Sequence, residues 1–132
     1  MEVHLLICGI LQIGLAILHI IFPKYFNWKQ ELASLSLINR QIMYIHTLFI
    51  AIAVGLMGIL SITEAEALVN TNLGQKICLG FGLFWLIRLF VQFFGYSSQL
   101  WKGKLFETVV HIVFSGLWLY MSVVFLTLAL NN

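Results

Sequence analysis

The sequence predicts an all-α fold: a transmembrane up-down four-helix bundle, with a short interfacial helix between the first two spans. The chain of 132 residues is 61% hydrophobic and only 9% charged, whereas about a quarter of the residues in an ordinary globular domain are charged. Apolar stretches at residues 3–22, 41–62, 75–96 and 105–130 are each long enough to cross a bilayer, which takes about 20 helical residues. Residues 1–132 are therefore expected to form a single transmembrane domain.

The first span is expected to end before Pro23, because proline removes a helical N–H donor. The start of the chain has an acidic residue and no Lys or Arg, so this helix is expected to be retained rather than cleaved as a signal peptide. In the connection that follows, Asn27 and Gln30 have the spacing of a capping box. Apolar side chains there predict the short helix in the membrane interface: Trp28, Leu32, Leu35 and Ile38.

The second span offers a surface of small residues for close helix approach, at Ala51, Gly55 and Gly58. Residues 63–74 are expected to be a short link to the third span. Trp101, in the third connection, is expected to anchor the chain in the interface. The two cysteines, Cys8 and Cys78, lie in apolar sequence and are expected to act as small hydrophobic side chains rather than form a disulfide.

The fourth span carries a polar stripe along one helical face. Its members recur at steps of three or four residues, which is the helical period: Glu107, His111, Ser115, Trp118 and Ser122. Ionisable groups in hydrocarbon cost roughly 2.5–3.5 kcal/mol each, so such a face usually points into protein.

The orientation of the spans follows from the distribution of Lys and Arg. The first and third connections hold Lys24, Lys29, Arg40, Lys102 and Lys104, and the opposite side holds only Lys76. The positive-inside rule then predicts that these two connections are cytoplasmic and that both termini lie outside.

Polar residues from all four spans are predicted to lie at one depth. At 1.5 Å rise per residue they fall roughly 5–12 Å below the cytoplasmic surface: His19, His46, Arg88, Gln92 and His111, with Glu107 close by. Three histidines from three different spans are hard to explain as independent core residues. The sequence therefore predicts an intramembrane pocket lined by His and Arg.

Each of these residues also has a structural explanation. A lone histidine in a span is commonly a hydrogen-bonded core group, and Arg88 can extend to the lipid headgroups. Glu107 can pair with Arg88 or Lys104. Ser115 and Ser122 can bond the carbonyl one turn earlier, and large aromatic side chains are usually core.

Three uses of the pocket remain open. His19, His46 and His111 can hold a transition-metal ion with Glu107 as a further ligand, or two of the histidines can hold haem b. Alternatively the pocket binds or conducts a small polar, anionic or amphiphilic molecule, with Arg88 supplying the charge and Trp85, Phe81 and Trp118 as apolar walls. Gln92 and the three histidines are then the hydrogen-bond partners, and Ser115 is a further candidate for ligand binding. In the third case the polar groups only join helices, and the protein is a structural or assembly subunit of a larger membrane complex.

No catalytic motif is present, so whether the protein is an enzyme is left open and no catalytic residue is named. The expected partners are the lipid bilayer and either further copies of this chain or a larger membrane complex. Nucleic-acid binding is not expected, because the few basic residues sit at the membrane surface.

Four short stretches carry a resemblance to known proteins. They are PKYFNW at residues 23–28, preceded by Phe22, NRQ at 39–41, FWLIR at 84–88 and WKGKLFETVVH at 101–111. In these stretches the chain resembles an uncharacterised family of small bacterial four-span integral membrane proteins. The resemblance implies a location in the bacterial inner membrane. It brings no activity, cofactor or site residue with it.

Overall fold

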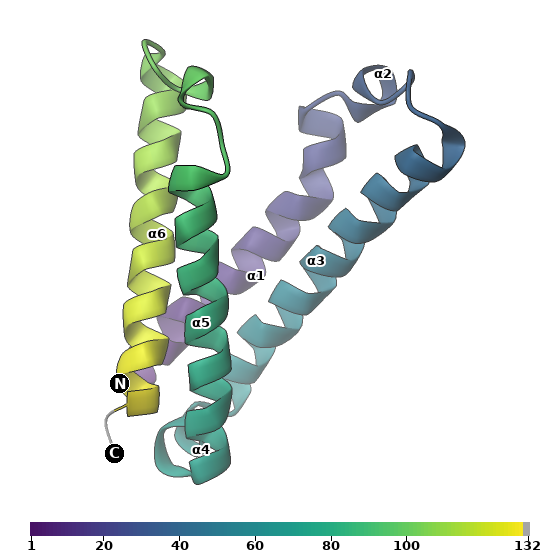
Figure 1. The fold of residues 1–132 in the computed structure, drawn as a ribbon. Helices are drawn as coiled ribbons and strands as arrows, with labels where there is room; N and C mark the ends of the chain where they lie inside the picture. The colour runs from purple at the N-terminus through teal and green to yellow at the C-terminus, as the bar shows by residue number, and fades with distance from the viewer. Residues whose placement is uncertain (131–132) are drawn as a thin grey trace. The chain divides into compact units, whose positions relative to one another are not determined.

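A computed structural model of the chain describes residues 1–130, and all regular elements among these residues are helical. In chain order they are α1 (Glu2–Tyr25), α2 (Trp28–Glu31), α3 (Leu37–Thr63), α4 (Ala65–Asn70), α5 (Asn72–Phe94), the 3₁₀ helix η1 (Ser98–Leu100) and α6 (Leu105–Leu130) (Figure 1). The predicted all-α class is confirmed, including a short helix between the first two spans. Four helices, α1, α3, α5 and α6, are long and apolar enough to cross a membrane.

The described chain divides into two compact units. Residues 6–65 form the first, here called the α1–α3 unit. The second, here called the α5–α6 unit, comprises residues 1–5 and the chain from Glu66 onward. The prediction that residues 1–132 form a single transmembrane domain stays a prediction.

In the α1–α3 unit, the two long helices approach closely at glycines. A Cβ placed on Gly58 would lie 2.7 Å from the carbonyl oxygen of Gly9 and 2.9 Å from Cγ1 of Ile13. Beside this contact Ser61 and Gln12, both fully buried, approach to 3.4 Å. The predicted small-residue surface is thus confirmed at Gly58, where the absence of a side chain lets two backbones meet.

The end of α1 corrects the sequence prediction. The helix continues through Pro23 and ends at Tyr25. Proline removes only its own donor, and the following amides still bond: the N–H of Phe26 donates to the carbonyl of Phe22 across 2.9 Å. The helix stops where Asn27 adopts a left-handed conformation, with φ 55°, which Asn tolerates better than most residues.

The expected capping box at the start of the next helix is not formed. The Asn27 side chain makes no bond to a backbone amide of α2; its Nδ2 instead donates to the side-chain oxygen of Gln30 across 2.9 Å. With this weak start α2 is only four residues long. Trp28 is its buried residue, and its ring meets that of Tyr44 edge-on with the centroids 5.4 Å apart.

Two helix starts also differ from the prediction, because hydroxyl caps precede the apolar runs. The Oγ of Ser36 accepts the N–H of Asn39, so α3 begins at Leu37 rather than near residue 41. The Oγ1 of Thr71 accepts the N–H of Gly74 across 2.9 Å, and α5 begins at Asn72. The link expected between spans two and three contains the short helix α4.

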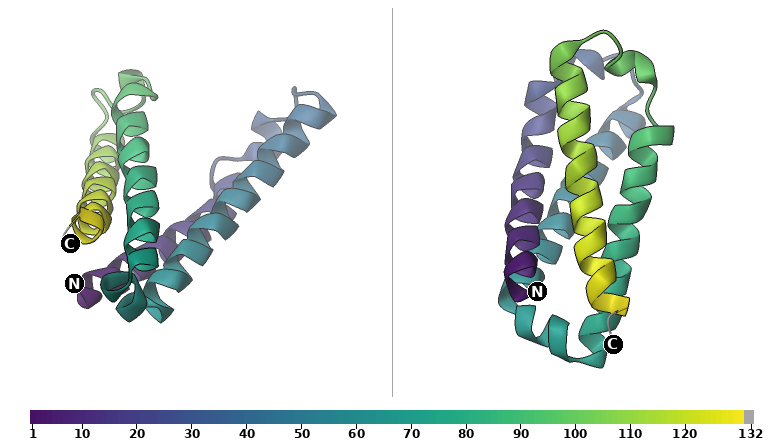
Figure 2. Two further views of the ribbon diagram at one scale, coloured as in Figure 1. Left: turned by 60° about the horizontal axis from the view of Figure 1, so that its bottom comes forward. Right: turned by 90° about the vertical axis from the view of Figure 1, so that its left-hand side faces the viewer.

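The α5–α6 unit is a pair of antiparallel helices that lie side by side in all views, joined through η1 (Figures 1 and 2). α6 has the bounds predicted from the sequence. The two helices approach closely near the C-terminal end of α6. A Cβ on Gly82 of α5 would lie 2.7 Å from the Leu126 side chain of α6. Phe81 and the fully buried Phe125 meet edge-on, with their centroids 5.4 Å apart.

Both cysteines are fully buried and free in the described chain, and their burial agrees with the predicted role as small hydrophobic side chains. In contrast, large apolar side chains are exposed along all four long helices. Exposed apolar surface of that extent is rare on soluble proteins and common on surfaces that face lipid or another protein.

Candidate functional site

The α5–α6 unit brings a cationic side chain against its helix partner. Arg88 and Gln92 are one helical turn apart on α5, and Nη1 of Arg88 donates to Oε1 of Gln92 across 3.2 Å. The Arg88 Cζ atom lies 4.9 Å from the ring centroid of Trp118 on α6 and 5.5 Å from that of Tyr96. The guanidinium is therefore half-buried between aromatic rings, an arrangement that favours a cation electrostatically.

Gln92 is a junction between the two helices. Its Oε1 also accepts the indole N–H of Trp118, at 3.4 Å. With two donors on Oε1, the amide nitrogen faces His111 of α6 and donates to its Nδ1 across 2.8 Å. A neutral imidazole that accepts at Nδ1 carries its proton on Nε2. This one buried amide thus fixes the tautomer of His111 as well as the position of Arg88.

An aromatic ring from the connection covers His111. The Trp101 ring stacks on the imidazole with centroids 3.9 Å apart and planes inclined by 14°. Phe93 meets the imidazole edge-on at 5.7 Å. Trp101 is held in turn by Thr108, whose hydroxyl donates to the Trp101 carbonyl across 2.6 Å. Trp101 was expected only as an interface anchor; it also forms one wall around His111.

Trp85 completes this group of side chains, here called the Arg88 cluster: Trp85, Arg88, Gln92, His111 and Trp118. Its ring is stacked on that of Trp118, with centroids 5.2 Å apart and planes inclined by only 6°. Trp85 is 3% exposed, and its indole N–H is buried without a hydrogen-bond acceptor in the described chain. Buried donors nearly always have a partner, so an unpaired one calls for an explanation.

No carboxylate compensates the charge of Arg88 within the described residues. Glu107 is exposed in the first turn of α6 and pairs with neither Arg88 nor Lys104. An acidic residue is favourable in that turn, because the helix dipole leaves its N-terminal end partially positive. The ion pair weighed as a structural explanation for Glu107 is therefore not formed.

The serines of the predicted stripe bond to their own helix. Ser115 donates its hydroxyl to the carbonyl of His111, and Ser122 donates to that of Trp118, each across 2.7 Å. The structural explanation given for both is confirmed. Ser115 remains half-buried one turn from His111, and its role in binding a ligand stays a prediction.

Two of the predicted metal ligands belong to the α1–α3 unit. His19 is half-buried, and its Nδ1 donates to the carbonyl of Leu15 across 2.7 Å, which leaves Nε2 as the free ring nitrogen. His46 is exposed, with no hydrogen bond or ring contact in the chain as described. Within either unit, residues 1–130 hold no group of three His, Cys, Asp or Glu side chains placed to bind a metal ion. That His19 and His46 meet His111 stays a prediction.

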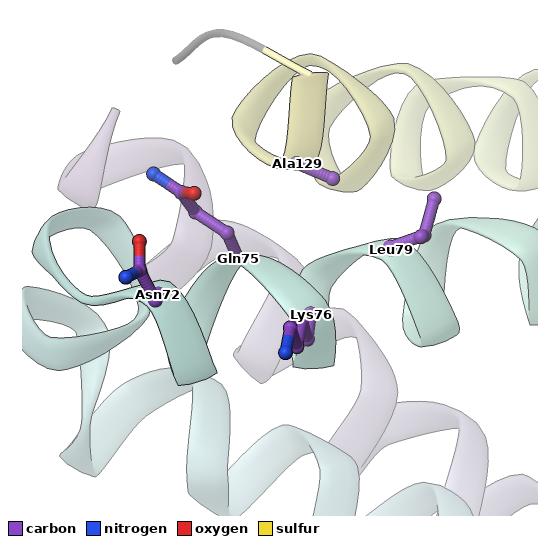
Figure 3. A pocket seen from close by; sticks show the side chains of 5 residues that line it. All are labelled: Asn72, Gln75, Lys76, Leu79 and Ala129. Atoms are coloured by element: carbon purple, nitrogen blue, oxygen red, sulfur yellow. The ribbon is translucent and has the colours of Figure 1, made fainter.

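A shallow hollow of about 230 Å³ lies elsewhere in the α5–α6 unit. Figure 3 shows its lining at the N-terminal end of α5 and the C-terminal end of α6: Asn72, Gln75, Lys76, Leu79 and Ala129. Leu79 and Arg88 are more than two helical turns apart, roughly 13 Å along the axis. The hollow is thus separate from the Arg88 cluster, and Lys76 is the one charged residue in its lining.

The chain matches no protein-family model, no curated protein and no solved structure. The suggested family resemblance therefore stays a prediction, and the site must be interpreted from its own chemistry.

The sequence indicated Arg88, Gln92, His111, Trp85 and Trp118 as site residues, and these five side chains do gather in one unit. Sequence reasoning missed the roles of Tyr96 and Phe93, which border the cluster. The one available signal was the density of aromatic residues at the end of the third span. Such residues are also typical of a membrane interface, so the signal was ambiguous.

Proposed function

We propose that this chain is an integral membrane protein whose Arg88 cluster binds a small polar ligand within the cytoplasmic half of the membrane. The observation that carries the proposal is an arginine in an apolar span, tied to Gln92 and Trp118 and without a carboxylate partner among residues 1–130. On insertion scales a cation at the centre of a span costs roughly 2.5–3.5 kcal/mol, and Arg88, six residues before the end of α5, bears part of that cost. Aromatic contacts offset about 0.5–2 kcal/mol of that cost. We propose that a bound polar ligand offsets part of what remains.

Of the two ligand classes predicted from the sequence, the small polar ligand has the better support at this cluster. The guanidinium repels a metal ion, and the neutral His111 presents a protonated Nε2 rather than a lone pair. A metal ion is thus better suited to a site away from Arg88.

The proposal includes the location of the protein. Four helices with the length and apolar composition of membrane spans support a bilayer location. The distribution of Lys and Arg supports cytoplasmic longer connections with both termini outside. The bacterial inner membrane is the compartment proposed, and further copies of this chain or a larger membrane complex are the proposed protein partners.

Mass spectrometry under non-denaturing conditions tests the proposal. The protein is purified in a neutral detergent, and molecules that remain bound are identified for the wild type, Arg88→Gln and Lys76→Gln. We expect a bound small molecule in the wild type and in Lys76→Gln, which alters the hollow at the other end of the unit. We expect its loss in Arg88→Gln. Equal retention in all three proteins would place the ligand away from the Arg88 cluster and refute the proposal.

A further inference from the structure

The donors and acceptors of the Arg88 cluster do not balance. Arginine has five N–H donors and no acceptor, and in the described chain one Arg88 donor is bonded, to Gln92. The acceptors on Gln92 and His111 are already occupied, by Trp118 and Arg88 on Oε1 and by the amide on Nδ1. No residue of the described chain accepts a bond from the remaining N–H groups of the half-buried Arg88 or from the buried indole N–H of Trp85, and Nε2–H of His111 is a further donor.

The Arg88 cluster has an excess of positive charge as well as an excess of hydrogen-bond donors. Arg88 is always protonated, and no carboxylate of the described chain lies within ion-pair distance of it. Since the half-buried guanidinium is enclosed by the rings of Trp118 and Tyr96, water meets only part of it. A group that supplies several acceptor atoms and one negative charge would satisfy the unpaired donors and compensate the positive charge. Carboxylates and phosphates have that character, and they match the planar fork of a guanidinium.

The position of the Arg88 cluster along the helix pair indicates the route by which an anionic group would reach it. Arg88 is six residues before the end of α5, and His111 six residues after the start of α6, so both lie roughly 9 Å along the axis from the same end of the helix pair. Lys102 and Lys104 are exposed in the connection at that end. An anion moving inward from the membrane interface thus meets these cations before it reaches Arg88.

We infer that the ligand of the Arg88 cluster is an oxyanion, a carboxylate or a phosphate, held by the guanidinium of Arg88 with donors from Trp85 and His111. This inference rests on the proposed function and narrows it to one chemical class. The oxyanion is either the headgroup of an amphiphile or a free anion. An amphiphile carries its headgroup to this depth with its chain in the hydrocarbon, whereas a free anion must cross the interface unaided.

Equilibrium titrations into the intact protein in neutral-detergent micelles test the inference. The probes are decanoate, dihexanoyl phosphatidic acid, decanol, decyltrimethylammonium and inorganic phosphate, with binding followed by isothermal titration calorimetry. We expect decanoate and the phosphatidic acid to bind at least tenfold more tightly than decanol or the ammonium amphiphile. Weak binding of inorganic phosphate would identify the amphiphile as the source. Equal binding of inorganic phosphate would identify the free anion, and the oxyanion assignment would stand.

Two variants distinguish binding of an anion at the Arg88 cluster from nonspecific attraction to positive charge. Arg88→Gln removes the charge, and Gln92→Glu supplies a carboxylate at the position now bonded to Arg88. Each is expected to weaken binding of the anionic amphiphiles at least tenfold. Gln92→Glu changes the charge at position 92 but not the size of the side chain. Lys76→Gln removes a positive charge at the other end of the unit and is expected to change binding less than twofold.

The outcomes separate failure of the oxyanion assignment from failure of the proposed function. Binding of decanol as tight as that of decanoate, and equally dependent on Arg88, would overturn the oxyanion assignment and leave a polar-ligand site. Binding of decanoate unchanged in Gln92→Glu would also overturn it, because a neutralised Arg88 should not attract an anion. If no probe binds in an Arg88-dependent manner, the inference fails, and retained binding of a co-purified molecule then decides the proposed function separately.

Discussion

The side-chain amide of Gln92 on α5 donates to Nδ1 of His111 on α6 across 2.8 Å, and the same amide accepts from Arg88 and Trp118 through its oxygen. One side chain thus ties a cation, an imidazole and an indole together across a helix pair. Such junctions position neighbouring groups rigidly, because every bond constrains the next.

Replacing Gln92 by leucine is therefore expected to loosen the α5–α6 pair. The change leaves the Trp118 N–H and the His111 ring nitrogen without their present partners, at a cost of about 1–3 kcal/mol for buried polar groups. Thermal unfolding in detergent should show a lower midpoint. The control is Ser122→Ala, since the Ser122 hydroxyl bonds only within its own helix. A midpoint equal to that of Ser122→Ala would mean that the junction contributes nothing to stability.

A second prediction concerns the close approach of α1 and α3 at Gly58. In Gly58→Ala the added methyl group would meet the Gly9 carbonyl oxygen at 2.7 Å, so the helices must separate. Overpacking of this kind typically costs about 1–3 kcal/mol. Gly14→Ala is the matched control in the same unit, because its Cβ meets no atom within 4 Å; it should be neutral or stabilise the helix by up to about 1 kcal/mol. Chemical unfolding monitored by circular dichroism compares the two, and equal stability would contradict the predicted contact.

Trp101 should depend on Thr108 for its position over His111. Thr108→Val keeps the shape of the side chain but removes the 2.6 Å bond to the Trp101 carbonyl, a loss of about 1 kcal/mol. We expect Trp101 to become more accessible to acrylamide, measured as quenching of its fluorescence in a variant whose other tryptophans are replaced by phenylalanine. Thr108→Ser retains the hydroxyl and should behave like the parent. Identical quenching in Val and Ser variants would show that the bond does not hold the ring.

The metal and haem hypotheses are tested by the histidines together. If His46 and His111 share one ligand, alanine at either position should remove it, while His4→Ala should leave it bound, since His4 pairs with Tyr120 across 2.8 Å. Elemental analysis of the purified proteins measures a metal ion, and visible absorbance in the Soret region measures haem. The same loss in all three variants would mean that the predicted pocket is misplaced.

The proposed orientation is testable by cysteine labelling, because Cys8 and Cys78 are fully buried and should not react with a membrane-impermeant maleimide. We expect Asn70→Cys, at the end of α4, to be labelled in intact cells. Ser98→Cys, in η1, should be labelled only in inverted membrane vesicles. The reverse pattern would invert the predicted topology and place the Arg88 cluster near the outer surface.

The sequence by itself determined the helical class and the four apolar spans, because hydrophobic runs of this length have one stable form in hydrocarbon. Helical spacing also identified the polar face of α6, since residues three or four apart must share a side. The sequence was less informative at helix ends, where single hydroxyl caps such as Ser36 and Thr71 decide the first turn and precede the apolar run. It gave the wrong end for α1 because Pro23 weakens a last turn without breaking it.

Only the tertiary structure decided how the polar residues bond. Nothing in the spacing of Gln92 and His111 reveals which end of the amide faces the imidazole; this depends on the two donors from Arg88 and Trp118 that reach the oxygen. The same holds for Glu107, whose pairing with Arg88 was open in the sequence and is absent from the described chain. Hydrogen bonds depend on distances of a few tenths of an ångström and on direction. Periodicity places a residue on a face, and packing between helices alone sets those distances.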